Sequence, residues 1–195
     1  MLGMAYAMTL RSPSAFDQRF NREKWQSAMM RIKIYNCKLK DLKGIHHLSQ
    51  LLAQYFPKPD QFVTGIYELL LNAVEHGNLG IGFEAKTELI RQGKWKEEIT
   101  RRLALPEYAK KEVEITITHD DHEGCLTIAD QGNGFPWREY VGRPADGKRP
   151  NGRGLWIAFN SKFDRIIFNP TGNEVTCVVQ YCHWSAPEDL MLSAT

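Results

Sequence analysis

Hydrophobic positions along the first half of the chain follow two different periods. Between Arg31 and Asn36 apolar residues recur at every second position, which is the period of a half-buried strand. Between Leu42 and Pro57 they recur at three- and four-residue spacing, which predicts a helix. A second and more apolar helix is predicted from Gln61 to Glu75, with Asp60 as its N-cap and Gly77 at its end.

The second half of the chain returns to the strand period. Val113 to Thr118 and Leu126 to Ala129 alternate on either side of a turn at Asp121 to Gly124, which predicts an antiparallel hairpin. Three further elements are predicted near the C-terminal end: a helix over Leu155–Phe163 and strands over Arg165–Phe168 and Glu174–Tyr181.

Two segments interrupt this pattern of helices and strands. Residues 83–106 are rich in charge and predict one or two amphipathic helices broken at Gly93. Residues 131–153 are rich in Gly, Pro and Arg and are too long for a routine connection. This second segment is therefore a candidate functional loop.

Chain length and the order of the elements predict the domain organisation. The chain has 195 residues, which corresponds to one domain with short extensions. We interpret residues 31–183 as this domain, residues 1–30 as an N-terminal arm and residues 184–195 as a C-terminal tail. Helices and antiparallel strands fall in separate blocks without β-α-β alternation, so we expect an α+β fold in the form of a two-layer sandwich.

Composition excludes several classes of protein. The 25 Lys and Arg residues against 23 Asp and Glu residues give a formal net charge of +2, which argues against a nucleic-acid-binding protein. The four cysteines lack the spacing of a zinc site and indicate reduced thiols. No apolar run is long enough to cross a membrane, and no basic segment precedes the apolar N-terminus, so we expect a cytoplasmic protein.

Polar residues interrupt the most apolar helix at regular spacing. Glu68, Asn72 and His76 follow one another at four-residue intervals and would line one stripe of a helix. Asn offers an oxygen ligand to Mg²⁺ and Glu can orient or deprotonate a nucleophile, so this stripe fits a phosphoryl-transfer site. A solvated stripe on an amphipathic helix is an alternative of equal weight.

Two glycine clusters follow along the chain. Asp130, Gly132 and Gly134 stand where a predicted strand ends, so the carboxylate can accept a hydrogen bond from an exocyclic amine while the glycines admit a flat ring. A simple Asx turn is the alternative. Gly152 and Gly154 precede a predicted helix, where free N–H groups can bind phosphate, and a plain loop-to-helix junction is the alternative.

Taken in chain order, these clusters resemble known motifs. ELLLNAVEHGN at 68–78, DQGNG at 130–134 and GRGL at 152–155 resemble the N box and the two glycine boxes of the GHKL-type ATPases, the histidine-kinase-like superfamily of gyrase, chaperone and mismatch-repair ATPases. Within it they look most like the bacterial anti-sigma-factor serine/threonine kinases of partner-switching systems. The resemblance implies a Bergerat ATP-binding fold, with a mixed, largely antiparallel sheet and helices on one face. It also implies that ATP and Mg²⁺ bind under a lid formed by residues 131–153.

The resemblance implies a role for each matching residue. Glu68 corresponds to the general base, Asn72 to the Mg²⁺ ligand and Asp130 to the acceptor of the adenine amine. The other residues that it implies in nucleotide binding are His76, Gly77, Gly132, Gly134, Gly152, Arg153, Gly154 and Leu155.

The γ-phosphate arginine and the adenine contact are matched more loosely. Arg149 lies near the position of the family's γ-phosphate arginine, although Arg143, Lys148 and Arg153 are also candidates. The family usually carries Thr at the start of the last strand, where this chain has Asn173. The Asn173 side chain can still hydrogen-bond the base.

We therefore expect an ATP-dependent kinase that phosphorylates a Ser of an antagonist protein and sequesters a sigma factor or a similar regulator. Family members commonly form homodimers. The alternative is a catalytically inactive, nucleotide-gated protein-interaction module, which the change at Asn173 and the long helical insertion over 83–106 keep open. A sensor histidine kinase is a poorer match, because His46 and His47 lack the flanking residues of a phosphoacceptor motif.

Overall fold

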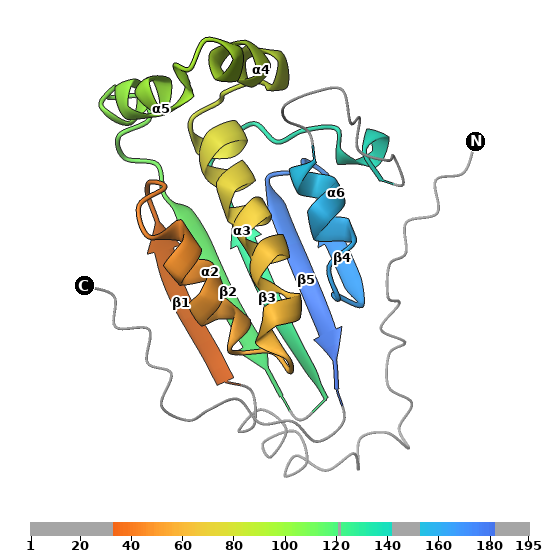
Figure 1. Ribbon diagram of the computed structural model, residues 1–195. Coiled ribbons are helices and arrows are strands. Elements are labelled where there is room, and N and C mark those ends of the chain that lie inside the picture. Colours follow the sequence, from red (N-terminus) through yellow and green to blue (C-terminus); the bar gives the residue numbers. More distant parts are fainter. Residues whose placement is uncertain (1–32, 121, 142–152, 182–195) are drawn as a thin grey trace, which may run out of the picture. The chain divides into compact units, whose positions relative to one another are not determined.

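A computed structural model describes residues 33–120, 122–141 and 153–181. The predicted N-terminal arm, the C-terminal tail and residues 142–152 of the predicted lid lie outside these residues. Within the described ranges, no helix has the length and apolar character that crossing a membrane requires. The elements, shown in Figure 1, are β1 (Lys33–Leu39), α2 (Ile45–Ala53), α3 (Val63–Asn72), α4 (Phe83–Arg91), α5 (Trp95–Leu103), β2 (Val113–His119), β3 (Glu123–Ala129), α6 (Gly154–Phe159), β4 (Arg165–Phe168) and β5 (Glu174–Gln180).

The strands form one five-stranded sheet in the order β1-β2-β3-β5-β4. Every neighbouring pair is antiparallel, including the predicted β2–β3 hairpin, in which Ile117 lies opposite Leu126. The expected α+β class is confirmed, whereas the expectation of a mixed sheet is wrong. Strand direction depends on where the long connections re-enter the sheet, and the pattern of hydrophobic residues does not specify this.

Helices α2, α3 and α6 cover one face of the sheet (Figure 1). Because successive side chains of a strand point to opposite faces, every second strand residue points toward these helices. Val113, Ile115 and Ile117 of β2 are buried on this face, whereas Glu114 between them is exposed. The alternation seen in the sequence therefore marks the helix-covered face of the sheet.

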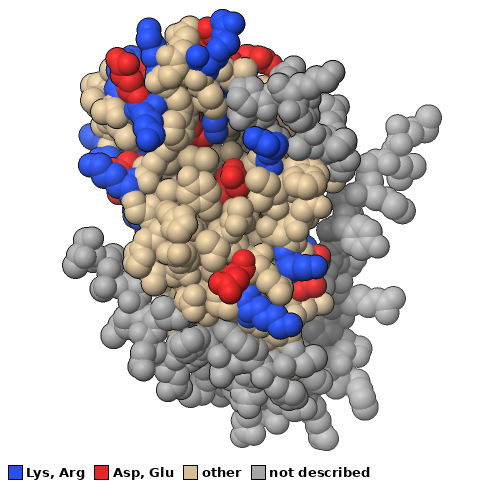
Figure 2. Space-filling model, viewed as in Figure 1, with Lys and Arg blue, Asp and Glu red and all other residues tan. Residues whose placement is uncertain are grey.

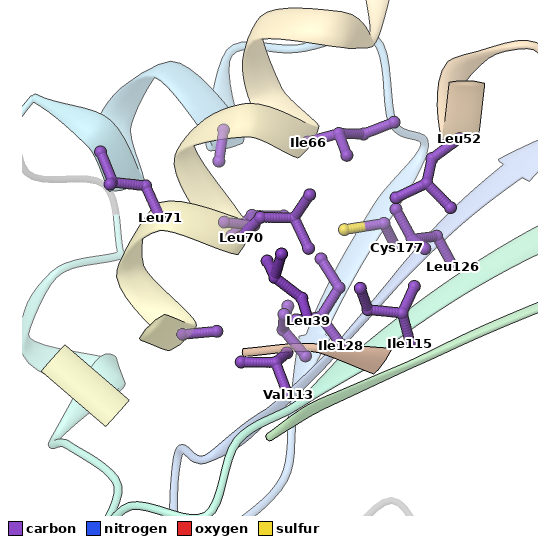
Figure 3. Close-up of a cluster of buried hydrophobic side chains, with 14 of the residues drawn as sticks. Leu39, Leu52, Ile66, Leu70, Leu71, Val113, Ile115, Leu126, Ile128 and Cys177 are labelled. Carbon is purple, nitrogen blue, oxygen red and sulfur yellow. The ribbon is translucent and has the colours of Figure 1, made fainter. Parts of the chain in front are cut away.

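The contact between α3 and the sheet forms the centre of the core. Figure 3 shows Ile66 and Leu70 of α3 near Leu126 and Cys177 of the sheet, and these four side chains are fully buried. Burial of a side chain such as Ile or Leu contributes roughly 1.5–3 kcal/mol. This apolar face fixes α3 on the sheet and so determines where the polar residues of the helix lie.

Helix α6 lies beside α3 and runs in the opposite direction. Near the start of α3, a Cβ on Gly65 would lie 2.2 Å from Ser161 Oγ, and further along α3, Glu68 approaches Gly154 at the start of α6. Helix α6 ends at Phe159, four residues before the predicted end, because Asn160 leaves the helical conformation and its side chain bonds to the preceding turn. The start of α6 therefore faces the C-terminal half of α3.

The N-terminal end of α3 differs from the prediction. Asp60 lies in a separate 3₁₀ turn, Pro59–Gln61, and does not cap α3. The N-cap is Phe62, which makes no side-chain capping hydrogen bond. Phe62 is 2% exposed, so packing rather than capping determines where this helix begins.

The C-terminal end of α3 also differs from the prediction. The helix does not close at Gly77 but continues through a π-helical turn, Ala73–Asn78, called the π turn below. Its wider hydrogen bonding joins the Leu79 N–H to the Val74 carbonyl at 2.9 Å. A π turn is a local widening of an α-helix that often occurs at functional sites.

The charged stretch forms two helices, α4 and α5, as predicted. They are separated at Gly93, whose φ of +69° favours glycine. Charged side chains gather over α4 and α5 in Figure 2, while much of the surface over α2, α3 and α6 in that view is uncharged. We call residues Phe83–Leu103 the α4–α5 segment.

Candidate functional site

Glu68 and Asn72 lie one turn apart on α3 and face the start of α6. A Cβ on Gly154 would lie 2.4 Å from Glu68 Oε2 and 3.7 Å from Asn72 Nδ2, so a larger residue at position 154 would displace the carboxylate. Both polar side chains are half-buried. The structure thus brings the first and third sequence motifs together.

The π turn brings the first motif against the second. A Cβ on Gly77 would lie 2.3 to 2.6 Å from the carboxyl atoms of Asp130, and a Cβ on Gly132 would lie 2.4 Å from the Gly77 carbonyl oxygen. Asp130 Oδ1 accepts the Gly132 N–H at 2.8 Å. Next to this contact, the Gln131 N–H donates to Asn78 Oδ1 at 2.7 Å. Gly77 and Gly132 are therefore required by close approach, and Gly77 is not a helix-ending residue.

Asn173 supports the end of β3 from the neighbouring turn. Its carbonyl oxygen accepts the Asp130 N–H at 2.9 Å, and its Nδ2 donates to the Asp130 carbonyl at 3.3 Å. Its Oδ1 accepts a hydrogen bond from Asn169 Nδ2 at 2.8 Å. In this structure the carboxamide predicted to contact a base is engaged with Asn169 and with the backbone that carries Asp130.

Gly134 anchors the beginning of the predicted lid. It has a φ of +74°, and a Cβ there would lie 2.1 Å from the Thr171 carbonyl oxygen. The Phe135 N–H donates to the same oxygen at 3.1 Å, and Trp137 Nε1 donates to the Asn169 carbonyl at 2.9 Å. Gly134 is thus required where this loop meets the turn between β4 and β5.

Burial changes the acidity of two carboxyl groups of the site. It raises the pKa of Asp130 to about 6, against the opposing effect of the Gly132 N–H. Burial also raises the pKa of Glu68. The positive charge of Lys86, and more weakly that of Arg153, acts in the opposite direction. None of the ion pairs among the described residues includes Asp130 or Glu68. Carboxyl groups perturbed by burial are common at sites that bind or react.

His76 does not continue the stripe of Glu68 and Asn72 as the α-helical spacing predicted. The π turn interrupts that spacing, and His76 Nδ1 lies 2.5 Å from the Ile81 carbonyl oxygen. Burial lowers the pKa of His76, so the neutral ring donates its Nδ1 proton to this oxygen. His76 therefore fixes the chain where it leaves the π turn.

A polar cluster centred on Glu75 was not predicted from the sequence. The Glu75 carboxylate is fully buried, lies 2.5 Å from Lys86 Nζ and also accepts a hydrogen bond from the Trp95 indole. Close by, Arg102 Nη1 donates to the Leu79 carbonyl at 2.7 Å. A carboxylate in the most apolar helix of the chain was the available signal, because a buried charge requires a partner.

The remaining predicted site residues lie at or beyond the edge of the described ranges. Arg149 and Gly152, with the other lid candidates Arg143 and Lys148, lie outside them. Arg153 is exposed at the N-cap of α6, and Leu155, on the first turn of that helix, packs against the core.

Comparison of the chain with models of known protein families and with curated proteins gave no match. The deciding feature is that Glu68 with Gly154, and Gly77 with Asp130, come from distant parts of the sequence and meet at the C-terminal end of α3 and the π turn.

Proposed function

We propose that this chain is an ATP-binding regulatory serine/threonine kinase of the anti-sigma-factor type, built on a Bergerat fold. The convergence of three sequence motifs around the end of α3 carries this proposal. Such a convergence is not required by a solvated helix stripe or by isolated glycine turns. It gives one region that combines a carboxylate, a carboxamide and closely packed glycines.

Asp130 is the proposed acceptor of the adenine amine. Its Oδ1 already accepts the Gly132 N–H, which holds the carboxylate in a fixed orientation and leaves Oδ2 for a ligand. The absence of side chains at Gly77 and Gly132 lets the backbone lie against this carboxylate. Asn173 contributes by holding the Asp130 backbone.

Asn72 is the proposed ligand of Mg²⁺. Its half-buried carboxamide lies near Gly154, where the lack of a Cβ lets the start of α6 approach Glu68 closely. Among the described residues, no group of three His, Cys, Asp or Glu side chains could hold a metal ion. Asn72 would therefore share the ion with phosphate oxygens and water, as Mg²⁺ sites on nucleotides usually do. The bound ion would neutralise charge on the phosphates.

Glu68 is the proposed general base. It accepts the hydroxyl proton of a Ser on the antagonist protein while the Ser oxygen bonds to the γ-phosphorus of ATP. The bond from that phosphorus to the β,γ-bridging oxygen breaks, and ADP leaves. Burial raises the pKa of Glu68, which makes it a stronger base near neutral pH. Arg149 of the lid is the proposed contact of the γ-phosphate.

The proposed partners are the phosphorylatable antagonist and a sigma factor or an equivalent regulator, with a homodimer as the proposed assembly. The proposed compartment is the cytoplasm. Cys37, Cys125 and Cys177 are free thiols in the described part of the chain, which agrees with a reducing compartment.

A catalytically inactive, nucleotide-gated interaction module is the second candidate. The observation that favours it is the engagement of Asn173 with Asn169 and with the backbone of Asp130. A carboxamide used in this way offers less to the base than the Thr that the kinase family usually carries there.

Calorimetric titration with a non-hydrolysable ATP analogue, with and without Mg²⁺, tests the nucleotide site. We expect Mg²⁺-dependent binding that Asp130→Ala abolishes, while Asn72→Ala removes its dependence on Mg²⁺. Thr64→Ala, at an exposed position of α3, is the matched control and should bind like the unmodified chain. No binding at saturating analogue would contradict the proposal.

Glu68→Gln separates the kinase from the inactive module. In a kinase this variant should bind the analogue while transfer to a Ser-bearing antagonist falls by about 10²- to 10⁴-fold, the usual contribution of a general base. Undiminished transfer would show that Glu68 is not the base. Absence of transfer in the unmodified chain, with binding intact, would favour the module.

A further inference from the structure

The α4–α5 segment is attached to the π turn at two places, the Glu75 side chain and the Leu79 carbonyl. Lys86 of α4 and Trp95 of α5 both bond to the buried carboxylate of Glu75, which lies in the π turn. Arg102, also on α5, donates to the Leu79 carbonyl directly after that turn. Both helices of the segment therefore hold the same stretch of chain.

The same turn contacts the end of β3 through its other residues. Gly77 packs against the Asp130 carboxyl group, and Asn78 Oδ1 accepts the Gln131 N–H at 2.7 Å. Asn78 is 1% exposed, so this hydrogen bond is shielded from water. A continuous set of contacts thus runs from α4 and α5, through Glu75 and the π turn, to Asp130.

We propose that the α4–α5 segment is a brace for the nucleotide site, in which Lys86 and Trp95 act through Glu75 to position the π turn against Asp130. This inference rests on the nucleotide site proposed above. Lys86 and Trp95 are positioning residues in this role, because their bonds are to Glu75.

A role in positioning explains the chemistry of the cluster better than stability alone. Removing a carboxylate and an ammonium from water costs free energy, so a buried ion pair adds little stability compared with apolar packing of the same volume. Two directional bonds to one carboxylate do, however, fix its position and orientation. The close approach of Gly77 to Asp130 leaves little tolerance for movement of the turn.

The test compares Lys86→Met and Trp95→Phe with Arg91→Met. Arg91 lies on the same helix, but its ion pair with Glu88 is solvent-exposed and does not involve the π turn. Two quantities are measured well below the thermal midpoint of each variant: the Kd of the Mg²⁺-bound ATP analogue by calorimetry, and the exchange rate of the Gln131 amide by NMR. The Ile117 amide, in the central part of β2, reports global opening.

We expect both brace variants to bind the analogue about tenfold more weakly, because small displacements of positioned groups have effects of this size or larger. The Gln131 amide should exchange faster relative to the Ile117 amide. Lys86→Arg should restore both values in part, because it keeps a cation beside Glu75, and Arg91→Met should change neither. Trp95→Phe removes the indole hydrogen bond and part of the ring volume but keeps an aromatic ring and every charge. It therefore provides the result if Lys86→Met does not fold.

An unchanged Kd in the folded brace variants would overturn the proposal, and so would Gln131 exchange that changes only in step with Ile117 exchange. Failure of the proposed function has a different signature, since the unmodified chain would then not bind the analogue. In that case the Gln131 amide decides alone: faster exchange in the brace variants would support the positioning of the π turn, and unchanged relative exchange would overturn it.

Discussion

The two sides of the π turn hold their carboxylates under opposite conditions. On the side of the α4–α5 segment, Glu75 is fully buried and bonded to both an ammonium group and an indole N–H. On the side of the sheet, Asp130 is half-buried, and none of the ion pairs among the described residues includes it. Burial there raises the pKa of Asp130 to about 6.

This difference separates two uses of a buried acid. The charge of Glu75 is balanced within the fold, so its removal should damage the fold. The charge of Asp130 is held at some cost in stability, which is typical of groups kept for a ligand. Substitutions on the two sides of the turn should therefore have opposite effects on stability.

The largest expected effect belongs to Glu75→Ala. This change leaves the Lys86 ammonium without its carboxylate and the Trp95 N–H without its acceptor. We expect the free energy of unfolding to fall by about 3–5 kcal/mol, as when one partner of a buried ion pair is removed. Denaturant unfolding measures the change, and a loss below about 1 kcal/mol would remove the contrast with Asp130.

Gly77→Ala should have the next largest effect. The new Cβ would lie 2.3 Å from Asp130 Cγ, so the turn or the carboxyl group must move. We expect a loss of about 1–3 kcal/mol of stability, as in other overpacked sites, together with weaker binding of the ATP analogue. Gly82→Ala is the matched control, since nothing lies within 4 Å of its Cβ and its φ is −65°. Equal effects of the two substitutions would contradict the close contact.

Asp130→Asn should raise stability at neutral pH while it weakens binding of the ATP analogue. The amide keeps an oxygen for the Gly132 N–H but removes a half-buried negative charge. The expected gain is about 1 kcal/mol at pH 7.5, after allowance for partial exposure of the group to solvent. Thermal and denaturant unfolding measure this gain in stability. A destabilised variant would show that other groups of the folded protein balance the Asp130 charge.

The stability of the unmodified chain should also depend on pH through Asp130. The pKa of the folded state is about 6, above that of the unfolded chain, so the folded state retains this proton to higher pH. The contribution of this group therefore favours folding at low pH and is lost as the pH rises through about 6. The stability difference between Asp130→Asn and the unmodified chain should thus shrink as the pH is lowered from 7.5 to 4.5. A pH-independent difference would contradict the raised pKa.

Glu88→Ala should have the smallest effect. Glu88 is paired with Arg91 on α4, and the side chain of Arg91 is 76% exposed and that of Glu88 46% exposed. We expect no measurable change in the free energy of unfolding, because exposed ion pairs contribute little. Comparison of this variant with Glu75→Ala in the same denaturation experiment measures how much burial changes the contribution of an acid that is paired with a base of the α4–α5 segment. Similar losses would indicate that burial does not distinguish them.

Residues with a clear hydrophobic period were the easiest part of the structure to predict. Strand β4 matches its predicted bounds of Arg165–Phe168, and the β2–β3 hairpin and the helix break at Gly93 are also confirmed. In each of these places a local pattern determines the local structure. The meeting of Glu68 with Gly154 could be anticipated only through the resemblance to a known family.

The features that sequence analysis missed depend on contacts between distant residues. A search for the 3.6-residue period of an α-helix does not detect the π turn. Asp60 has the chemistry of an N-cap but lies in a separate 3₁₀ turn. Glu75 looked like the end of an apolar helix because its partners, Lys86 and Trp95, lie in a separate segment that was predicted only as amphipathic helices. Tertiary structure selects among local options in all three cases.

The π turn also determines which direction the residues after α3 face. It holds about one more residue than an α-helical turn of the same rise. If the same residues, Ala73 to Asn78, instead formed regular α-helical turns, the chain after them would be rotated by about 100° relative to α3. Gly77 would then no longer face Asp130, although every side chain of both motifs would still be present. The site therefore depends on the direction in which the π turn makes each residue face, as well as on which residues are present.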